Sequence, residues 1–142
     1  MATDKRVVVY GASGYTGRLI CEYLREYNIP FLAAGRSLSR LKSVVEAVPG
    51  IDTVDHEIVE VEHSKDALVE TFRGADVVLN TVGPFARWGH PVVEACLEIG
   101  AHYTDSNGEQ NWMIDVEAKY SAEFSSRGLV LTPGLAQMYS IG

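Results

Sequence analysis

The sequence predicts an α/β fold with one doubly wound parallel sheet. Short apolar runs alternate along the chain with longer segments of 3.6-residue periodicity, which is the pattern of consecutive βαβ units. A glycine-rich turn follows the first apolar run at once, and the length of 142 residues suits one domain around one core. The six predicted strands are residues 6–10, 31–35, 54–61, 76–80, 101–105 and 129–131.

In the first half, residues 6–10 are continuously apolar, as a central strand covered on both faces requires. Apolar residues recur at helical spacing from 15 to 28, and Pro30 prevents the helix from continuing. The second strand, 31–35, leads to Ser37, which caps a helix reaching Val48. Acidic residues alternate through the third strand, 54–61, so we expect it near an exposed edge of the sheet.

In the second half, Ser64 caps a short helix through residue 72, and strand 76–80 follows. A long turn, residues 81–89, leads to a helix with Pro91 in its first turn and Gly100 after its end. Strand 101–105 precedes a helix that carries apolar residues from 112 to 124 and ends at Gly128, before the last strand.

Six strands joined by five right-handed crossovers predict the strand order 3-2-1-4-5-6. Ligands bind to such sheets beyond the carboxyl ends of the strands, where the strand order reverses. The turns after Tyr10, Gly35, Asn80 and Asp105 should therefore surround one crevice.

The first of these turns has the residues of a phosphate-binding loop. Gly11 permits the tight turn, Gly14 leaves room for a pyrophosphate beside the backbone, and Gly17 lets the helix pack closely on the strand. The backbone N–H groups of residues 13–16 should then point at the phosphates, which the positive end of the helix dipole also favours, and the hydroxyls of Ser13 and Thr16 can add hydrogen bonds. We interpret the turn as the dinucleotide site of a Rossmann fold.

The second turn favours NADP(H) over NAD(H). A site for NAD usually has an acidic residue about 20 positions after the glycines, to bind the ribose 2′-hydroxyl, but no Asp or Glu occurs between Tyr27 and Val45. Arg36, Ser37 and Arg40 stand there instead. Arginine can bind a 2′-phosphate bidentately, whereas an acid would repel it.

The turn after the fourth strand should receive the nicotinamide half. Val82 and Gly83 leave room there, Pro84 bends the chain, and Thr81 or Asn80 could bond a ribose hydroxyl. Phe85 and Trp88 could cover a ring of the ligand or simply pack in the interior. His90 could cap the following helix or act in catalysis, and Asp105 could support its loop or act as an acid–base group. The structural interpretation is favoured for His90 and Asp105, so no catalytic residue is assigned.

Longer segments carry a family resemblance. GASGYTGRLI (11–20), GRSLSRL (35–41), NTVGPFARWGHPVVEACLEIGAHYTD (80–105) and the Gly108–Glu109 pair together resemble the saccharopine dehydrogenase-like oxidoreductases, within them most of all the bacterial members related to trans-acting enoyl reductases. The resemblance implies an NAD(P)-binding Rossmann domain followed by a substrate domain. Its implied cofactor contacts are Gly11, Ser13, Gly14, Tyr15, Thr16, Arg36, Ser37, Val82, Gly83 and Pro84.

The chain departs from that family at two places. Relatives tend to have Leu-Thr where this chain has Ser106-Asn107, and a Pro-Gly-Phe-Asp-like turn where Pro133-Gly134 is followed here by no acid. Residues 135–142 carry no charge. We therefore expect residues 1–142 to be the N-terminal part of a longer enzyme, or else to cover this stretch by forming a homodimer.

The predicted function is an NADP(H)-dependent oxidoreductase that transfers hydride to or from a small-molecule or acyl substrate. A non-catalytic redox sensor or regulatory module is the alternative. GASGYTG also resembles the N-acetyl-glutamyl-phosphate reductases, but their cysteine nucleophile after Pro-Gly is Leu135 here. A short-chain dehydrogenase that works by Tyr-x-x-x-Lys is excluded, since no such pair occurs.

Composition excludes other classes of function. The net charge of −7 disfavours nucleic acid and anionic membranes as partners. No run approaches the roughly 20 apolar residues of a membrane span, and the N-terminus has no targeting character, so we expect a cytoplasmic protein. Cys21 and Cys96 fall on apolar helix positions as buried thiols, and the four histidines are too scattered for a metal site.

Overall fold

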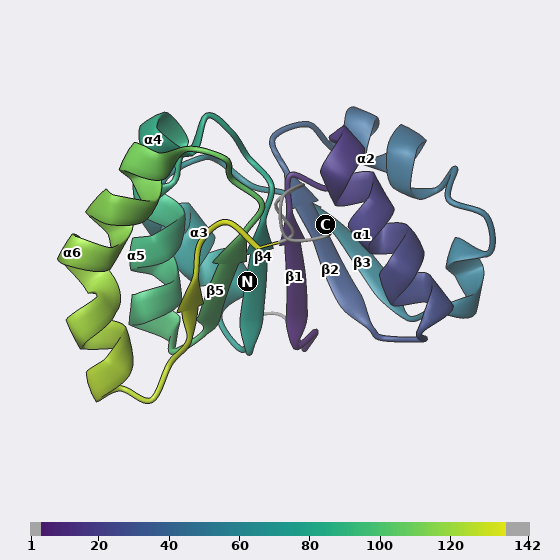
Figure 1. Cartoon of the computed structure of the whole chain (residues 1–142). Coiled ribbons are helices and arrows are strands. Elements are labelled where there is room, and N and C mark those ends of the chain that lie inside the picture. The colour runs from purple at the N-terminus through teal and green to yellow at the C-terminus, as the bar shows by residue number, and fades with distance from the viewer. Residues whose placement is uncertain (1–3, 136–142) are drawn as a thin grey trace.

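Six parallel strands form one sheet in the order β3-β2-β1-β4-β5-β6 in the computed structural model, which describes residues 4–135 (Figure 1). The predicted strand order is thus confirmed. The strands are β1 (Val7–Tyr10), β2 (Phe31–Gly35), β3 (His56–Glu60), β4 (Val77–Asn80), β5 (His102–Asp105) and β6 (Leu131–Thr132). The helices are α1 (Tyr15–Glu26), α2 (Leu38–Val45), the 3-10 turn η1 (Ile51–Thr53), α3 (Lys65–Phe72), α4 (Phe85–Trp88), α5 (His90–Ile99) and α6 (Gln110–Ser126).

Helices cover the sheet on both faces, and each face has its own core. Because side chains alternate along a strand, Val9 of β1 points into a cluster with α1 and α2, whereas Val8 and Tyr10 point into a larger cluster with α3, α5 and α6. Cys21 and Cys96 are buried free thiols, one in each cluster. This two-sided burial explains why β1 and β2 are continuously apolar in sequence.

The exposed third strand is also as expected. β3 lies at the edge of the sheet beside β2, and its residues alternate between exposed and half-buried positions. It begins at His56 rather than at residue 54, because residues 51–53 form a 3-10 turn after the left-handed Gly50.

Two segments differ from the sequence-based expectation. Residues 85–88, expected within a long turn, form the helix α4, because the carboxylate of Glu109 accepts hydrogen bonds from the backbone N–H groups of Phe85 and Ala86 at 2.7 and 3.1 Å. The last strand begins at Leu131 rather than at residue 129. Leu129 still donates its N–H to the carbonyl of Phe124 and so belongs to the end of α6.

Residues 4–135 do not meet the requirements of a membrane-spanning helix or of a three-ligand metal site. No helix among them is both long and apolar enough to cross a bilayer. They contain no group of three His, Cys, Asp or Glu side chains placed to hold a metal ion. Apart from Leu135, the uncharged stretch 135–142 lies outside the described residues.

Candidate functional site

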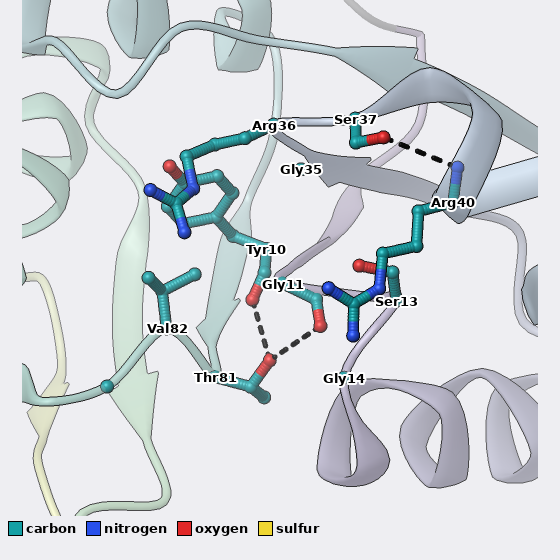
Figure 2. Close-up of a pocket in the computed structure, with 11 residues that line it drawn as sticks. Tyr10, Gly11, Ser13, Gly14, Gly35, Arg36, Ser37, Arg40, Thr81 and Val82 are labelled. Carbon is teal, nitrogen blue, oxygen red and sulfur yellow. Dashed lines mark hydrogen bonds between the residues drawn. The ribbon is translucent and has the colours of Figure 1, made fainter.

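A cleft of about 360 Å³ opens where β1, β2 and β4 end (Figure 2). It is the crevice expected at the point where the strand order reverses. Its lining comes from three separate turns: Tyr10, Gly11, Ser13, Gly14, Gly35, Arg36, Ser37, Arg40, Thr81, Val82 and Gly83. The fold thereby brings together nine of the predicted site residues, from positions up to 72 residues apart in the chain.

The other four predicted residues lie beside the cleft. Tyr15 begins α1 with its side chain 81% exposed. Thr16 lines a smaller apolar pocket between α1 and the ends of β4 and β5. Gly17 is buried against β1, and Pro84 is the exposed residue before α4. Tyr15 and Thr16 stand in the first turn of α1, where backbone N–H groups have no partner within the helix.

The three glycines have different structural roles. Gly11 has φ +88°, and a Cβ there would lie 2.6 Å from Oγ1 of Thr81. A Cβ on Gly17 would overlap the carbonyl oxygen of Gly11 and lie 2.7 Å from Cα of Ala12, so α1 packs on the turn only without a side chain. Gly14 has an ordinary φ of −81°, and a Cβ there would be 3.4 Å from the nearest atom. The packing of the fold therefore does not require a glycine at position 14.

Arg36, Ser37 and Arg40, from the turn after β2 and the start of α2, form a positively charged rim of the cleft. Figure 2 shows the guanidinium of Arg40 directed toward Ser13 and Gly14, and that of Arg36 directed toward Tyr10 and Val82. Neither guanidinium forms an ion pair with a carboxylate of residues 4–135. Ser37 caps α2, its hydroxyl accepting the N–H of Arg40 at 3.4 Å. The cleft is therefore basic in a chain whose net charge is −7.

One acidic residue reaches the rim from β3. The backbone N–H of Leu38 donates to Oε2 of Glu60 at 2.7 Å, immediately after Ser37. This carboxylate lies outside residues 27–45, the stretch that carries no acid, because it belongs to another strand. The signal was present in the strand order, since the last residue of the third strand must lie beside the end of the second.

Tyr10 and His63 form an additional part of the site that sequence reasoning missed. The hydroxyl of Tyr10 is hydrogen-bonded to Nδ1 of His63 at 2.6 Å, and the two rings stack. Burial raises the pKa of Tyr10 to about 12, although the charge of Arg36 opposes the rise. Desolvation lowers the pKa of His63, and Arg36 lowers it further. Both side chains therefore favour their neutral forms beside the guanidinium.

The polar groups after β4 mainly bond to the protein itself. Thr81 lines the cleft, but its hydroxyl donates to the carbonyls of Tyr10 and Gly11 at 2.8 and 3.1 Å. The Asn80 side chain is buried, donates to the hydroxyl of Tyr103 and accepts the N–H of Val82. The Asn80 side chain therefore bonds within the protein interior. A contact between Thr81 and the ribose of a cofactor stays a prediction.

Asp105 supports the loop after β5. Its carboxylate is 3% exposed and accepts hydrogen bonds on both oxygens. The donors come from four residues: the Tyr103 hydroxyl, the Trp112 indole, the backbone and side-chain N–H groups of Asn107, and the Gly134 backbone N–H. A carboxylate so fully occupied holds the loop in place, which agrees with the structural interpretation of its sequence.

The aromatic and histidine side chains near α5 have packing roles. Phe85 is 7% exposed and joins the larger core. Gly89, not His90, is the N-cap of α5, so the expected capping role of His90 is wrong. The ring of His90 instead bridges to α6, with Nδ1 bonded to the hydroxyl of Tyr120 at 2.7 Å and Nε2 3.1 Å from Asp115.

A doubly wound parallel sheet with a glycine turn after its first strand and a basic rim after its second defines an NAD(P)-binding Rossmann domain. The chain belongs to the saccharopine dehydrogenase NADP binding domain family, whose family model matches residues 7–129. The family resemblance of the sequence is thus confirmed, and it places the chain in an oxidoreductase family.

Several curated relatives share more than a third of the aligned residues. The trans-acting enoyl reductase of Mycobacterium leprae is 38% identical over 136 residues, which cover 89% of this chain and 32% of the relative. The human saccharopine dehydrogenase-like oxidoreductase is 34% identical, with 92% and 34% covered. A lipid droplet localized protein of Caenorhabditis elegans is 36% identical, with 87% and 31% covered. The chain thus spans about a third of the length of these relatives.

Solved structures with the same fold are more distant in sequence. The apo saccharopine dehydrogenase (L-Glu forming) of Saccharomyces cerevisiae matches with a TM-score of 0.72 at 16% identity, over 92% of this chain and 27% of that one. The leucoanthocyanidin reductase–NADPH complex of Vitis vinifera matches with a TM-score of 0.63 at 17% identity, over 90% and 48%. At these identities the likeness concerns the fold alone.

Proposed function

We propose that this domain binds NADP(H) as the cofactor domain of an oxidoreductase, which transfers hydride to or from a small-molecule or acyl substrate. One observation carries the proposal. Two arginines, Arg36 and Arg40, line the same cleft as the glycine turn, and neither guanidinium has a carboxylate partner in residues 4–135.

The residues present fit the phosphates of the dinucleotide. The pyrophosphate would lie over Gly14, where the first turn of α1 presents N–H groups and the positive end of the helix dipole, and where no side chain caps the helix. Arg36, Ser37 and Arg40 would hold the 2′-phosphate, since arginine offers paired donors in the geometry of phosphate oxygens. The nicotinamide half would lie beside the end of β4, where the exposed Gly83 lines the cleft.

The bound cofactor would supply the hydride chemistry, and this chain would orient it. We assign no catalytic residue within the cleft. Among residues 4–135, its lining contains no carboxylate, histidine or cysteine side chain, and the hydroxyl of its one tyrosine, Tyr10, is bonded to His63. The groups that bind the substrate belong, in this proposal, to a further domain outside the 142 residues. In support, the chain covers only about a third of each curated relative.

Cofactor binding tests the proposal directly. The dissociation constants of NADPH and NADH are measured for the unaltered protein and for Arg36→Ala. Binding is followed by the quenching of tyrosine and tryptophan fluorescence, or by energy transfer from these residues to the reduced nicotinamide. Loss of charge-assisted hydrogen bonds worth about 1.5–3 kcal/mol should raise the dissociation constant of NADPH by roughly 10- to 150-fold, with little change in that of NADH. Lys42→Ala is the matched control, because Lys42 is an exposed cation of α2 that does not line the cleft.

Two results would contradict the proposal. A protein that prefers NADH, and in which Arg36→Ala weakens neither cofactor, does not use the rim for a 2′-phosphate. NADPH binding without turnover by the full-length protein on carbonyl, imine or enoyl substrates would instead identify a redox sensor or regulatory module.

A further inference from the structure

A carboxylate occupies the start of α2, at the edge of the proposed cofactor site. Glu60 ends β3, and the parallel register pairs it with Gly35, the last residue of β2. The bond from the N–H of Val61 to the carbonyl of Gly35, 2.9 Å long, holds this register one residue further. The side chain then reaches the N–H of Leu38, with its Oε2 at 2.7 Å.

This bond makes Glu60 a neighbour of the residues that would hold a 2′-phosphate. Leu38 directly follows Ser37, and Arg36 and Arg40 lie within the same turn of chain (Figure 2). The N–H groups in the first turn of a helix favour a negative group. Here one of them is already bonded to a carboxylate of the protein itself.

An ionised carboxylate treats the two cofactors differently. It carries only acceptors, so it can accept a hydrogen bond from a ribose 2′-hydroxyl. A 2′-phosphate also carries only acceptors when fully ionised, and the two negative charges repel each other. The rim therefore contains groups with opposite preferences, two guanidinium groups and one carboxylate.

We propose that Glu60 sets the cofactor preference of this site, by competing with the 2′-phosphate of NADP(H) for the start of α2 and by accepting the 2′-hydroxyl of NAD(H). The inference rests on the proposed function, since it assumes that the adenosine ribose lies at this rim. Glu60 thereby reduces the ratio of NADH to NADPH dissociation constants that Arg36 and Arg40 alone would produce. The protein should therefore bind both cofactors.

Glu60→Gln tests the role of the charge. The glutamine carbonyl can still accept the N–H of Leu38, so α2 keeps its bond and only the negative charge is removed. Dissociation constants of NADPH and NADH are measured for both proteins, together with the thermal midpoint. Removing the charge of Glu60 should lower the dissociation constant of NADPH about fivefold, which corresponds to about 1 kcal/mol, the repulsion of two well-solvated like charges a few ångströms apart. The dissociation constant of NADH should change less than about twofold.

Glu46→Gln is the matched control. Glu46 is an exposed carboxylate at the other end of the same helix, and its replacement changes the net charge by the same amount. It should leave both dissociation constants unchanged. Raising the salt concentration should reduce the gain in Glu60→Gln, because screening weakens the repulsion that the substitution removes.

The outcomes separate this inference from the proposed function. If the unaltered protein binds NADPH but Glu60→Gln leaves the ratio of the two dissociation constants unchanged, the inference fails and the proposed function stands. If the variant weakens both cofactors equally and lowers the thermal midpoint, Glu60 has a structural role and the inference also fails. An unaltered protein that binds neither dinucleotide overturns both.

Discussion

Gly14 and Gly17 lie in the same turn, yet the structure predicts opposite effects when each is replaced by alanine. A methyl group on Gly17 would overlap the carbonyl of Gly11 and come within 2.7 Å of Cα of Ala12, both of which are backbone atoms. Neither can rotate away, so α1 must move outward from β1. A methyl group on Gly14 meets nothing closer than 3.4 Å, and φ of −81° is ordinary for alanine.

The free energies follow from these contacts. Overpacking a close contact typically costs about 1–3 kcal/mol, and rigid backbone on both sides places Gly17→Ala near the upper end. For a domain of this size, that loss should lower the thermal midpoint by roughly 5–12 °C. Gly14→Ala should change the midpoint by only a few degrees, because it costs no packing. It should nevertheless weaken NADPH at least about tenfold, since its methyl group lies where the pyrophosphate must approach the backbone.

Two measurements on each variant separate the effects. Urea or thermal denaturation followed by circular dichroism gives the stability, and cofactor fluorescence gives the dissociation constant of NADPH. Gly17→Ala with the stability of the unaltered protein would refute the packing argument. Gly14→Ala that binds NADPH normally would show that the pyrophosphate does not lie over this residue, and the proposed cofactor pose would have to be abandoned.

Three further predictions concern groups around the site. Asp105→Asn places an amide where buried donors converge, and urea denaturation should show a loss of about 3 kcal/mol, whereas the exposed Asp52→Asn should stay within about 0.5 kcal/mol of the unaltered protein. Glu109→Ala removes the carboxylate that accepts the first N–H groups of α4. It should raise the dissociation constant of NADPH a few-fold and leave that of 2′,5′-ADP, which lacks the nicotinamide half, unchanged. An equal rise for both ligands would contradict this prediction. Desolvation lowers the pKa of His63 below 6.5 in the folded protein, so the unfolded chain binds the proton more readily. The stability that is present above about pH 6.5 should therefore be lost as the pH falls toward the folded pKa. His63→Gln should reduce the pH dependence of the unfolding free energy, measured by denaturation between about pH 5 and 7.

The sequence-based prediction of the fold succeeded where the signal was local. The continuous apolar runs of β1 and β2 and the serine caps of α2 and α3 are properties of a few adjacent residues. The prediction was wrong where a distant side chain decides the local structure. α4 exists because a carboxylate more than 20 residues later bonds its first N–H groups, and no local pattern encodes such a pair.

The same division applies to the candidate site. The glycine spacing and the basic residues after the second strand were visible in the sequence, since each lies within one short turn, and the strand order placed both turns at one crevice. The partners of those residues were not visible. Which side chain faces Tyr10, which oxygen meets Leu38 and which donors surround Asp105 depend on the register between elements far apart in the chain.

The amino-acid sequence by itself determined the parallel sheet, the glycine turn after its first strand and the family, because periodicity, turn chemistry and short motifs are short-range properties of the chain. Only the tertiary structure decided that Glu60 shares the rim with Arg36 and Arg40, and that Asp105 supports a loop. The physical reason is distance. Electrostatic and hydrogen-bonding partners act over a few ångströms in space, and folding alone brings residues from different strands within that range.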